Sequence, residues 1–285
     1  MAAPQRPSAG TWILAAVELV AAALIAWLLI ARSGDSASHQ HMAGTDMAAT
    51  VSSVASWGWP EFVAGLLAVA AVLWWLASRY PIAALVAGAA LVGLTCLSTV
   101  RILAVQSHLF AMVALELLLV AAPLLLLAAV KTPPRHSTPR DWGGGATVLA
   151  VAAALAYVGL LIGVHLPGVH RAAAEEGIAP LWFVVLALAV GVCYWAAVLR
   201  TGARVPRVVR LAILLGAQEV AAFIGLLSLF GAWAPMGHAH LLGLSAGWDQ
   251  RLGGVFMMAT CAAVAIPVAR GLQADRGSDD RGTLD

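Results

Sequence analysis

The feature that most limits the folds open to this chain is a series of apolar runs, each close to twenty residues long. We place eight at 12–31, 61–78, 82–100, 109–130, 146–165, 180–199, 209–231 and 252–269. About 20 helical residues cross roughly 30 Å of hydrocarbon, and in lipid each backbone polar group must find its partner internally. Hydrophobic residues make up 62% of the chain and charged residues 11%, too few polar groups to cover a soluble globule. We therefore predict an all-α, polytopic membrane helix bundle with about eight transmembrane helices.

The links between the runs predict how the chain is organised. Only residues 79–81 separate the second run from the third, which predicts a tight helical hairpin. A Pro- and Gly-rich link predicts a flexible connection between two halves. We therefore expect a four-helix half at 1–130 with an outer loop at 33–58, a linker at 131–145, a four-helix half at 146–270 and a disordered tail at 271–285. The alternative for the first run is a secretion signal cleaved near Ala37.

The distribution of Lys and Arg among alternate loops predicts the orientation. With the N-terminus inside, twelve of these residues fall on the inner side and four on the outer side. Both termini are therefore expected in the cytoplasm, with the protein in the plasma membrane of a bacterial-type cell. The same orientation places seven of the eight histidines outside or at outer helix ends: His39, His41, His108, His165, His170, His238 and His240.

Two outer segments combine imidazole and thioether groups, which together suit copper, and above all Cu(I). The connection at 233–258 gathers Met236, His238, His240, Asp249 and Gln250 ahead of Met257 and Met258. The outer loop offers a possible capture group at His39, His41, Met42 and Met47. The alternatives are that Asp249 and Gln250 cap the last helix, that the methionines are packing residues of which only one faces the bundle, and that the loop residues are incidental.

Two helix ends carry further candidates. His108, Met112 and Glu116 are four residues apart and therefore line one face of the fourth span. His165 precedes Pro167, which is expected to end the fifth span. The alternative is that His108 is an interfacial residue, Met112 a packing residue and Glu116 a hydrogen-bonded carboxyl.

Acidic residues deep inside spans are costly and usually face the bundle interior. We expect Glu116, Glu219 and Gln250 to be buried polar groups, with Gln218 and Glu219 facing Glu116 or Glu18. Together with the preceding candidates, this gives a predicted set of copper ligands: His108, Met112, His165, His238, His240, Asp249 and Met257.

Some functions are excluded or disfavoured by what the sequence contains. Cys96, Cys193 and Cys261 lie in separate apolar runs, which predicts small buried residues rather than a redox motif. Hydrolase, kinase and dehydrogenase motifs do not occur, and nothing indicates nucleic-acid binding. We therefore predict a protein that is not an enzyme.

Three segments resemble the CtaG-type cytochrome c oxidase assembly factors. These are VHLPGVHRAAAEEGIAPLWFVVLALAVGVCYWAAVL, GLSAGWDQRLGGVFMM and the end of the fourth span, LLLVAAPLLLL. The resemblance covers roughly Gln106 to Ala269. It implies a multi-helix membrane domain associated with copper delivery to, or maturation of, haem-copper oxidases, and it points to His165, Asp249, Gln250 and Met257.

The chain departs from that family pattern at several points. A pair of histidines four apart in the family's fourth span becomes His108 with Met112 here, and the Trp before the family's HLP is missing. The sixth span is entered through APLWF, whereas the family has histidines near an acidic residue there. The resemblance is therefore to a divergent member, whose metal site is altered or lost.

Our leading hypothesis is a membrane assembly factor that holds or supplies copper, as Cu(I), for a haem-copper cytochrome c oxidase. Its expected partners are oxidase subunits or a copper chaperone, and it is surrounded by lipid; the oligomeric state stays open. One alternative is a permease for copper or another cation, with Glu116 and Glu219 on the ion path. The other is a structural membrane partner that has lost the metal ligands.

Overall fold

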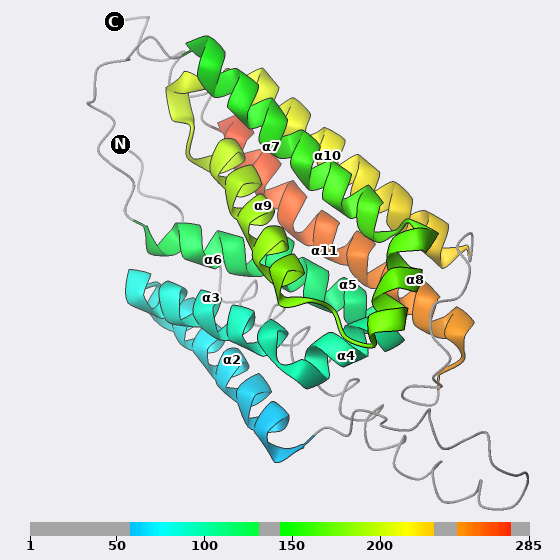
Figure 1. Ribbon diagram of the computed structural model, residues 1–285. Coiled ribbons are helices and arrows are strands. Elements are labelled where there is room, and N and C mark those ends of the chain that lie inside the picture. Colours follow the sequence, from blue (N-terminus) through cyan, green and yellow to red (C-terminus); the bar gives the residue numbers. More distant parts are fainter. Residues whose placement is uncertain (1–57, 131–142, 231–243, 275–285) are drawn as a thin grey trace, which may run out of the picture. The chain divides into compact units, whose positions relative to one another are not determined.

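The computed structural model describes residues 58–130, 143–230 and 244–274, and all regular structure in these ranges is helical (Figure 1). The all-α prediction is confirmed for this part of the chain. The predicted first span at 12–31 and nearly all of the predicted outer loop and tail lie outside the described residues. So do six predicted metal-binding residues: His39, His41, Met42, Met47, His238 and His240.

Ten α-helices and two short turns make up the described ranges. They are α2 (Trp59–Ser78), α3 (Pro81–Cys96), α4 (Ser98–Gln106), α5 (His108–Glu116), the π-helical turn η2 (Leu117–Ala121), α6 (Ala122–Ala129), α7 (Gly143–Val164), α8 (Pro167–Glu176), α9 (Leu181–Leu199), the 3₁₀ turn η3 (Gly202–Arg204), α10 (Arg207–Leu229) and α11 (Ala246–Ala274).

Six of the helical segments are long and apolar enough to cross a membrane, or seven if a bent pair counts as one span. Each of the seven spans predicted between residues 61 and 269 coincides with one of these segments. The chain is thus a multi-pass membrane protein. The total of eight spans stays a prediction, because the first predicted span is not among the described residues.

The third predicted span, 82–100, differs from the prediction because it is broken rather than continuous. α3 and α4 meet at an angle of 64° at Leu97, whose backbone is extended. α4 carries polar residues that hydrogen-bond to distant parts of the chain. The Thr99 hydroxyl donates to the Glu61 carboxyl of α2 at 2.7 Å, and the Arg101 guanidinium donates to the Ala179 carbonyl at 2.6 Å.

The predicted hairpin between the second and third spans is confirmed. Arg79 closes α2 in the left-handed conformation, with φ 57°, and its N–H donates to the Trp75 carbonyl at 2.8 Å. Its guanidinium lies over the Trp75 ring, 4.7 Å from the centroid. Pro81 then begins α3, where its lack of an N–H costs nothing.

The π-helical turn η2 joins α5 to α6 and explains how α9 packs against them. Pro123 has no N–H to give to the carbonyl of Leu119, four residues earlier. The indole N–H of Trp195 in α9 donates to that carbonyl instead, at 2.8 Å. A Cβ atom on Gly191, one turn before Trp195, would lie 2.8 Å from the same oxygen. The backbone of α9 therefore approaches η2 closely because residue 191 has no side chain.

α10 and α11 lie side by side (Figure 1) and share the most extensive helix contact of the described bundle. A Cβ atom on Gly225 of α10 would lie 2.9 Å from the Gly254 carbonyl of α11, and a Cβ atom on Gly254 would collide with the Gly225 carbonyl. Small residues that let backbones touch are typical of helix pairs in membranes. The main core fills the space between α5, α7, α9, α10 and α11, and its largest buried side chains include Trp195, Tyr157 and Tyr194.

Candidate metal centre

The first turn of α11 is attached to the start of α5 through Asp249. The buried carboxylate accepts the Ser107 hydroxyl at 2.6 Å and the backbone N–H of His108 at 2.6 Å, with the N–H of Leu109 at 3.4 Å. The Ser107 hydroxyl in turn accepts from the Phe110 N–H at 3.3 Å as the N-cap of α5. Asp249 thus satisfies amide groups that α5 cannot bond itself, and its negative charge suits the positive helix end.

This geometry corrects the alternative that Asp249 caps the last helix, and it argues against Asp249 as a copper ligand. Asp249 caps a helix, as the alternative required, but that helix is α5 and not its own helix α11. Both carboxylate oxygens accept hydrogen bonds from the start of α5, which favours a structural role. Its neighbour Gln250 is buried as predicted, with 3% of its surface exposed.

His108 lies inside the bundle rather than at its surface. It is 1% exposed, and its ring fits against α11 at Gly253. A Cβ atom on Gly253 would lie only 2.6 Å from Cδ2 and 3.3 Å from Nε2 of the His108 ring. The absence of a side chain at residue 253 therefore creates the space that the imidazole occupies.

His165 brings a second imidazole to the same place from the end of α7. Its ring is also 1% exposed and meets the His108 ring edge to face, with centroids 5.8 Å apart and planes at 74°. α7 ends at Val164, shortly before Pro167, as predicted for the fifth span. Pro167 then begins α8. The structure thus brings together two of the predicted ligands, from parts of the chain that are 57 residues apart in sequence.

The neutral form of His165 suits metal binding. Its Nδ1 lies 2.7 Å from the Leu161 carbonyl, so the Nδ1–H donates there and the lone pair is on Nε2. Burial lowers the pKa of the imidazole below its usual value, and the hydrogen bond to Leu161 opposes this only in part. The ring is held in the tautomer that a metal ligand needs.

α5 and α11 run in parallel and keep register below the histidines. Gly253 faces His108, and the helical repeat places Cys261 at the level of Glu116, eight residues further along each helix. Met112 and Met257 occupy the matching positions four residues below His108 and Gly253. Both are buried, 2% and 1% exposed, and belong to the same core cluster.

The prediction that only one of the two adjacent methionines faces the bundle is wrong, because Met257 faces α5 and Met258 faces α10. Met258 is half-buried and turns toward α10, where a Cβ atom on Gly225 would lie 2.8 Å from its Cγ. Met257 is therefore the candidate ligand of the pair and Met258 a packing residue.

The deep acid Glu116 is buried, but the second predicted acid, Glu219, is not. Glu116 is 7% exposed and lies close to Thr260 and Tyr157. The prediction that Glu219 is buried is wrong: it is exposed, because the preceding residue, Gln218, takes the inward position of α10. Successive helix residues point about 100° apart, so only one of the two can face Tyr157 and Tyr194.

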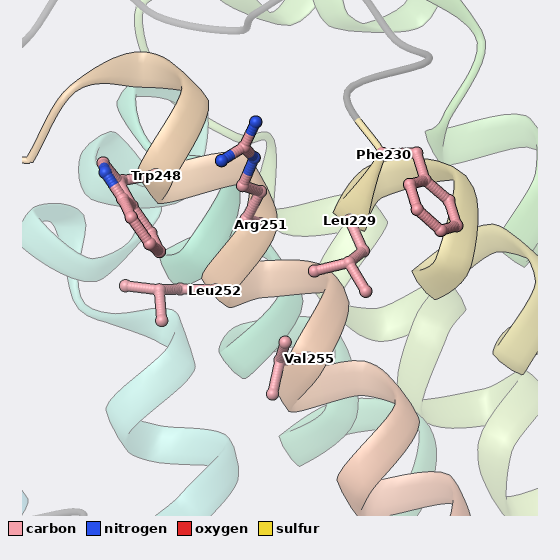
Figure 2. A pocket seen from close by; sticks show the side chains of 6 residues that line it. All are labelled: Leu229, Phe230, Trp248, Arg251, Leu252 and Val255. Atoms are coloured by element: carbon pink, nitrogen blue, oxygen red, sulfur yellow. The ribbon is translucent and has the colours of Figure 1, made fainter.

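A groove of about 380 Å³ lies between the end of α10 and the start of α11, and Figure 2 shows its lining. The Arg251 guanidinium there lies 5.6 Å from the centroid of the Trp248 ring. None of the predicted metal ligands lines the groove, so it is separate from the histidine pair. Its lining residues are Leu229, Phe230, Trp248, Arg251, Leu252 and Val255.

Within the described residues, no three His, Cys, Asp or Glu side chains gather in a metal-binding cluster. The donor set that the described helices bring together is two imidazoles with two thioethers below them. Sequence reasoning missed Gly253, Thr260 and Cys261 as parts of this site. The spacing 253, 257, 261 on α11 matches the spacing 108, 112, 116 on α5, and this shared period was the signal that could have found Gly253 and Cys261.

The fold and the site define a class of protein: a multi-pass helical membrane protein with paired histidines at one end of its bundle. The family model of the cytochrome c oxidase caa3 assembly factor (Caa3_CtaG) matches residues 67–273, and the chain belongs to this family. The resemblance is thereby confirmed, over a longer region than the three motifs covered. No curated protein and no solved structure matches the chain.

Proposed function

We propose that this chain holds Cu(I) between His108 and His165 and supplies it during assembly of a haem-copper cytochrome c oxidase. Membership of an assembly-factor family supports the biological role and a non-catalytic one. The observation that carries the copper assignment is the edge-to-face pair of buried imidazoles, 5.8 Å apart, from α5 and the end of α7.

The donor chemistry fits copper better than other ions. Imidazole nitrogens and thioether sulfurs are soft enough for Cu(I), whereas magnesium and calcium prefer carboxylate and carbonyl oxygens. Met112 and Met257 lie one helical turn below the histidines on the shared face. His108 and His165 would hold the ion, with a thioether completing its coordination. Asp249 would act indirectly, by fixing the helix end that carries His108.

Delivery requires that a partner protein can reach the bound ion from one side of the membrane. We propose that the histidine end faces the outside of the plasma membrane, where an oxidase subunit or a copper chaperone would exchange the ion. The loop residues His39, His41, Met42 and Met47 and the connection residues His238 and His240 remain proposed donors on the same side. The excess of Lys and Arg on the opposite loops supports this orientation.

The test compares Cu(I) binding by purified full-length protein with that of single variants, under anaerobic conditions and against a coloured Cu(I) chelator. We expect His108→Gln and His165→Gln each to weaken binding at least tenfold. The matched pair Met257→Leu and Met258→Leu separates ligand from packing, because only the first should weaken binding. Wild-type protein that takes up no Cu(I) would contradict the proposal.

A cellular experiment tests the role in assembly. Cells carrying His108→Gln in place of the wild-type chain are expected to make oxidase that contains haem but less copper. Oxidase copper content is measured after purification, with Met258→Leu as the control. Unchanged copper content in the His108→Gln cells would show that the chain acts in assembly by another route.

A further inference from the structure

Cys261 is the cysteine of this chain that faces the bundle interior. Cys96 and Cys193 are exposed on the surface of the helices, contrary to the prediction that all three are buried, whereas Cys261 is 7% exposed. Cys261 lies one helical turn after Met257 and therefore continues the face of α11 that meets α5. A thiol here is surrounded by other groups of the shared face, not by lipid.

Glu116 is directed at the same place and lacks a full set of partners. Its side chain is more than nine-tenths buried, and within the described residues its Oε2 makes no hydrogen bond. Thr260, Tyr157 and Cys261 lie near the carboxyl, and none of these three side chains carries a positive charge. A buried carboxyl without a cationic partner is costly in a membrane and is a reason to expect a bound cation.

Three sulfur-containing side chains lie on the facing sides of α5 and α11, over two successive helical turns. Met112 lies one turn before Glu116 on α5, and Met257 lies one turn before Cys261 on α11, in the register fixed by the His108–Gly253 contact. Thiolate and thioether ligands select Cu(I) among the common biological cations. The hard ions that a carboxylate alone would attract are disfavoured by the same sulfur atoms.

We propose that Cys261, together with the thioethers of Met112 and Met257, forms a second Cu(I) site below the His108–His165 pair, with Glu116 as the acceptor of the thiol proton. This inference rests on the proposed function, because it assigns the same ion to a deeper position. Binding breaks the S–H bond of Cys261 and forms a Cu–S bond without electron transfer. An ionised Glu116 accepts the released proton, so the site changes from one negative charge to neutral.

The second site ends the series of ligands. The residues that follow Glu116 inside the bundle are Leu118, Leu119 and Val120, all buried and apolar. Copper at Cys261 therefore has its way out through the histidine end, and the site stores an ion rather than passing it across the membrane.

The experiment titrates full-length protein in detergent with Cu(I) against a chelator and counts ions per chain. Cys261→Ser is expected to bind one Cu(I) fewer than wild type, and X-ray absorption of the loaded protein is expected to show fewer sulfur neighbours per copper. Cys193→Ser is the matched control and should change neither. Glu116→Gln is expected to lower the affinity of the second ion about 10- to 100-fold.

Unfolding temperatures of the metal-free variants separate loss of a ligand from loss of the fold. Cys261→Ala provides a second substitution of similar size and should bind the same reduced number of ions. A Cys261→Ser protein that binds as many ions as wild type, with an unchanged sulfur count, would overturn the second site while leaving the histidine site intact. The second site would also be overturned if His108→Gln lost copper binding while the Cys261 variants kept all of it. Wild-type protein that binds no copper would refute the proposed function itself.

Discussion

Gly253 decides whether an imidazole can lie between α5 and α11. The ring of His108 fills the volume that a side chain would otherwise take, so the histidine is buried without a cavity around it. The sequence itself shows adjacent glycines, Gly253 and Gly254, but not the residue that packs against Gly253. The partner lies 145 residues away in sequence, and only the packing of the two helices identifies it.

Replacing Gly253 by alanine is expected to destabilise the protein and to weaken copper binding. The new Cβ atom would lie 2.6 Å from Cδ2 of His108, and overpacking of this kind costs about 1–3 kcal/mol. Thermal unfolding and Cu(I) affinity measure the two effects. Gly271→Ala is the control on the same helix, because a Cβ atom there would meet nothing within 4 Å. Equal behaviour of the two variants would contradict the packing argument.

The buried ring of His165 makes the stability of the metal-free protein depend on pH. Burial lowers its pKa in the folded protein from the usual value of 6.5, so the unfolded chain binds the proton more readily. The stability is fully present above pH 6.5 and falls as the pH drops through the lower folded pKa. Denaturant unfolding between about pH 7.5 and about pH 5 measures this loss. It should be smaller in His165→Gln, and an identical pH dependence would refute the assignment.

The helices themselves were largely predictable, whereas their interruptions were not. Long apolar runs fixed α2, α7, α9 and α10 to within a few residues. The break at Leu97 was missed because Thr99 and Arg101 are compatible with the end of a span. Their partners, Glu61 and Ala179, belong to distant parts of the chain. Contacts of this kind do not appear in a local hydrophobicity pattern.

Trp195 shows how one helix can complete the hydrogen bonding of another. Trp195→Phe would leave the Leu119 carbonyl of η2 without the indole donor in an apolar environment, which costs about 1–3 kcal/mol. The expected result is a lower unfolding temperature. Trp182→Phe on the same helix is the control, because Trp182 is 65% exposed. A shift of similar size in both variants would mean that the indole bond contributes nothing specific.

In the candidate site, spacing within one helix could be read from the sequence, whereas contacts between helices could not. The shared face of His108, Met112 and Glu116 followed from spacing within one helix, and the predicted burial of Glu116 was confirmed. The exposure of Glu219 could not be foreseen, since both Gln218 and Glu219 are polar and the choice between them depends on which side of α10 faces α7 and α9. The attachment of Asp249 to α5 likewise required the arrangement of the whole bundle.

The placement of both chain ends in the cytoplasm is a prediction for the complete molecule. It follows from the twelve-to-four distribution of Lys and Arg and requires an even number of crossings. A fluorescent protein that matures only in the cytoplasm, fused after Asp285, should therefore fluoresce, and a periplasm-active phosphatase at the same position should be inactive. The opposite pair of results would require an odd number of crossings or a reversed orientation.

The glycine contact between α10 and α11 has a consequence for how such a protein can diversify. Main-chain atoms of Gly225 and Gly254 set how closely α11 approaches α10, on a different side of α11 from Met257 and Cys261. If the proposed copper sites exist, exchanging one donor for another at position 257 or 261 would alter the preference for an ion while leaving the contact between α10 and α11 in place. The proposed ligands Met257 and Cys261 and the packing residue Gly254 therefore lie on different sides of α11.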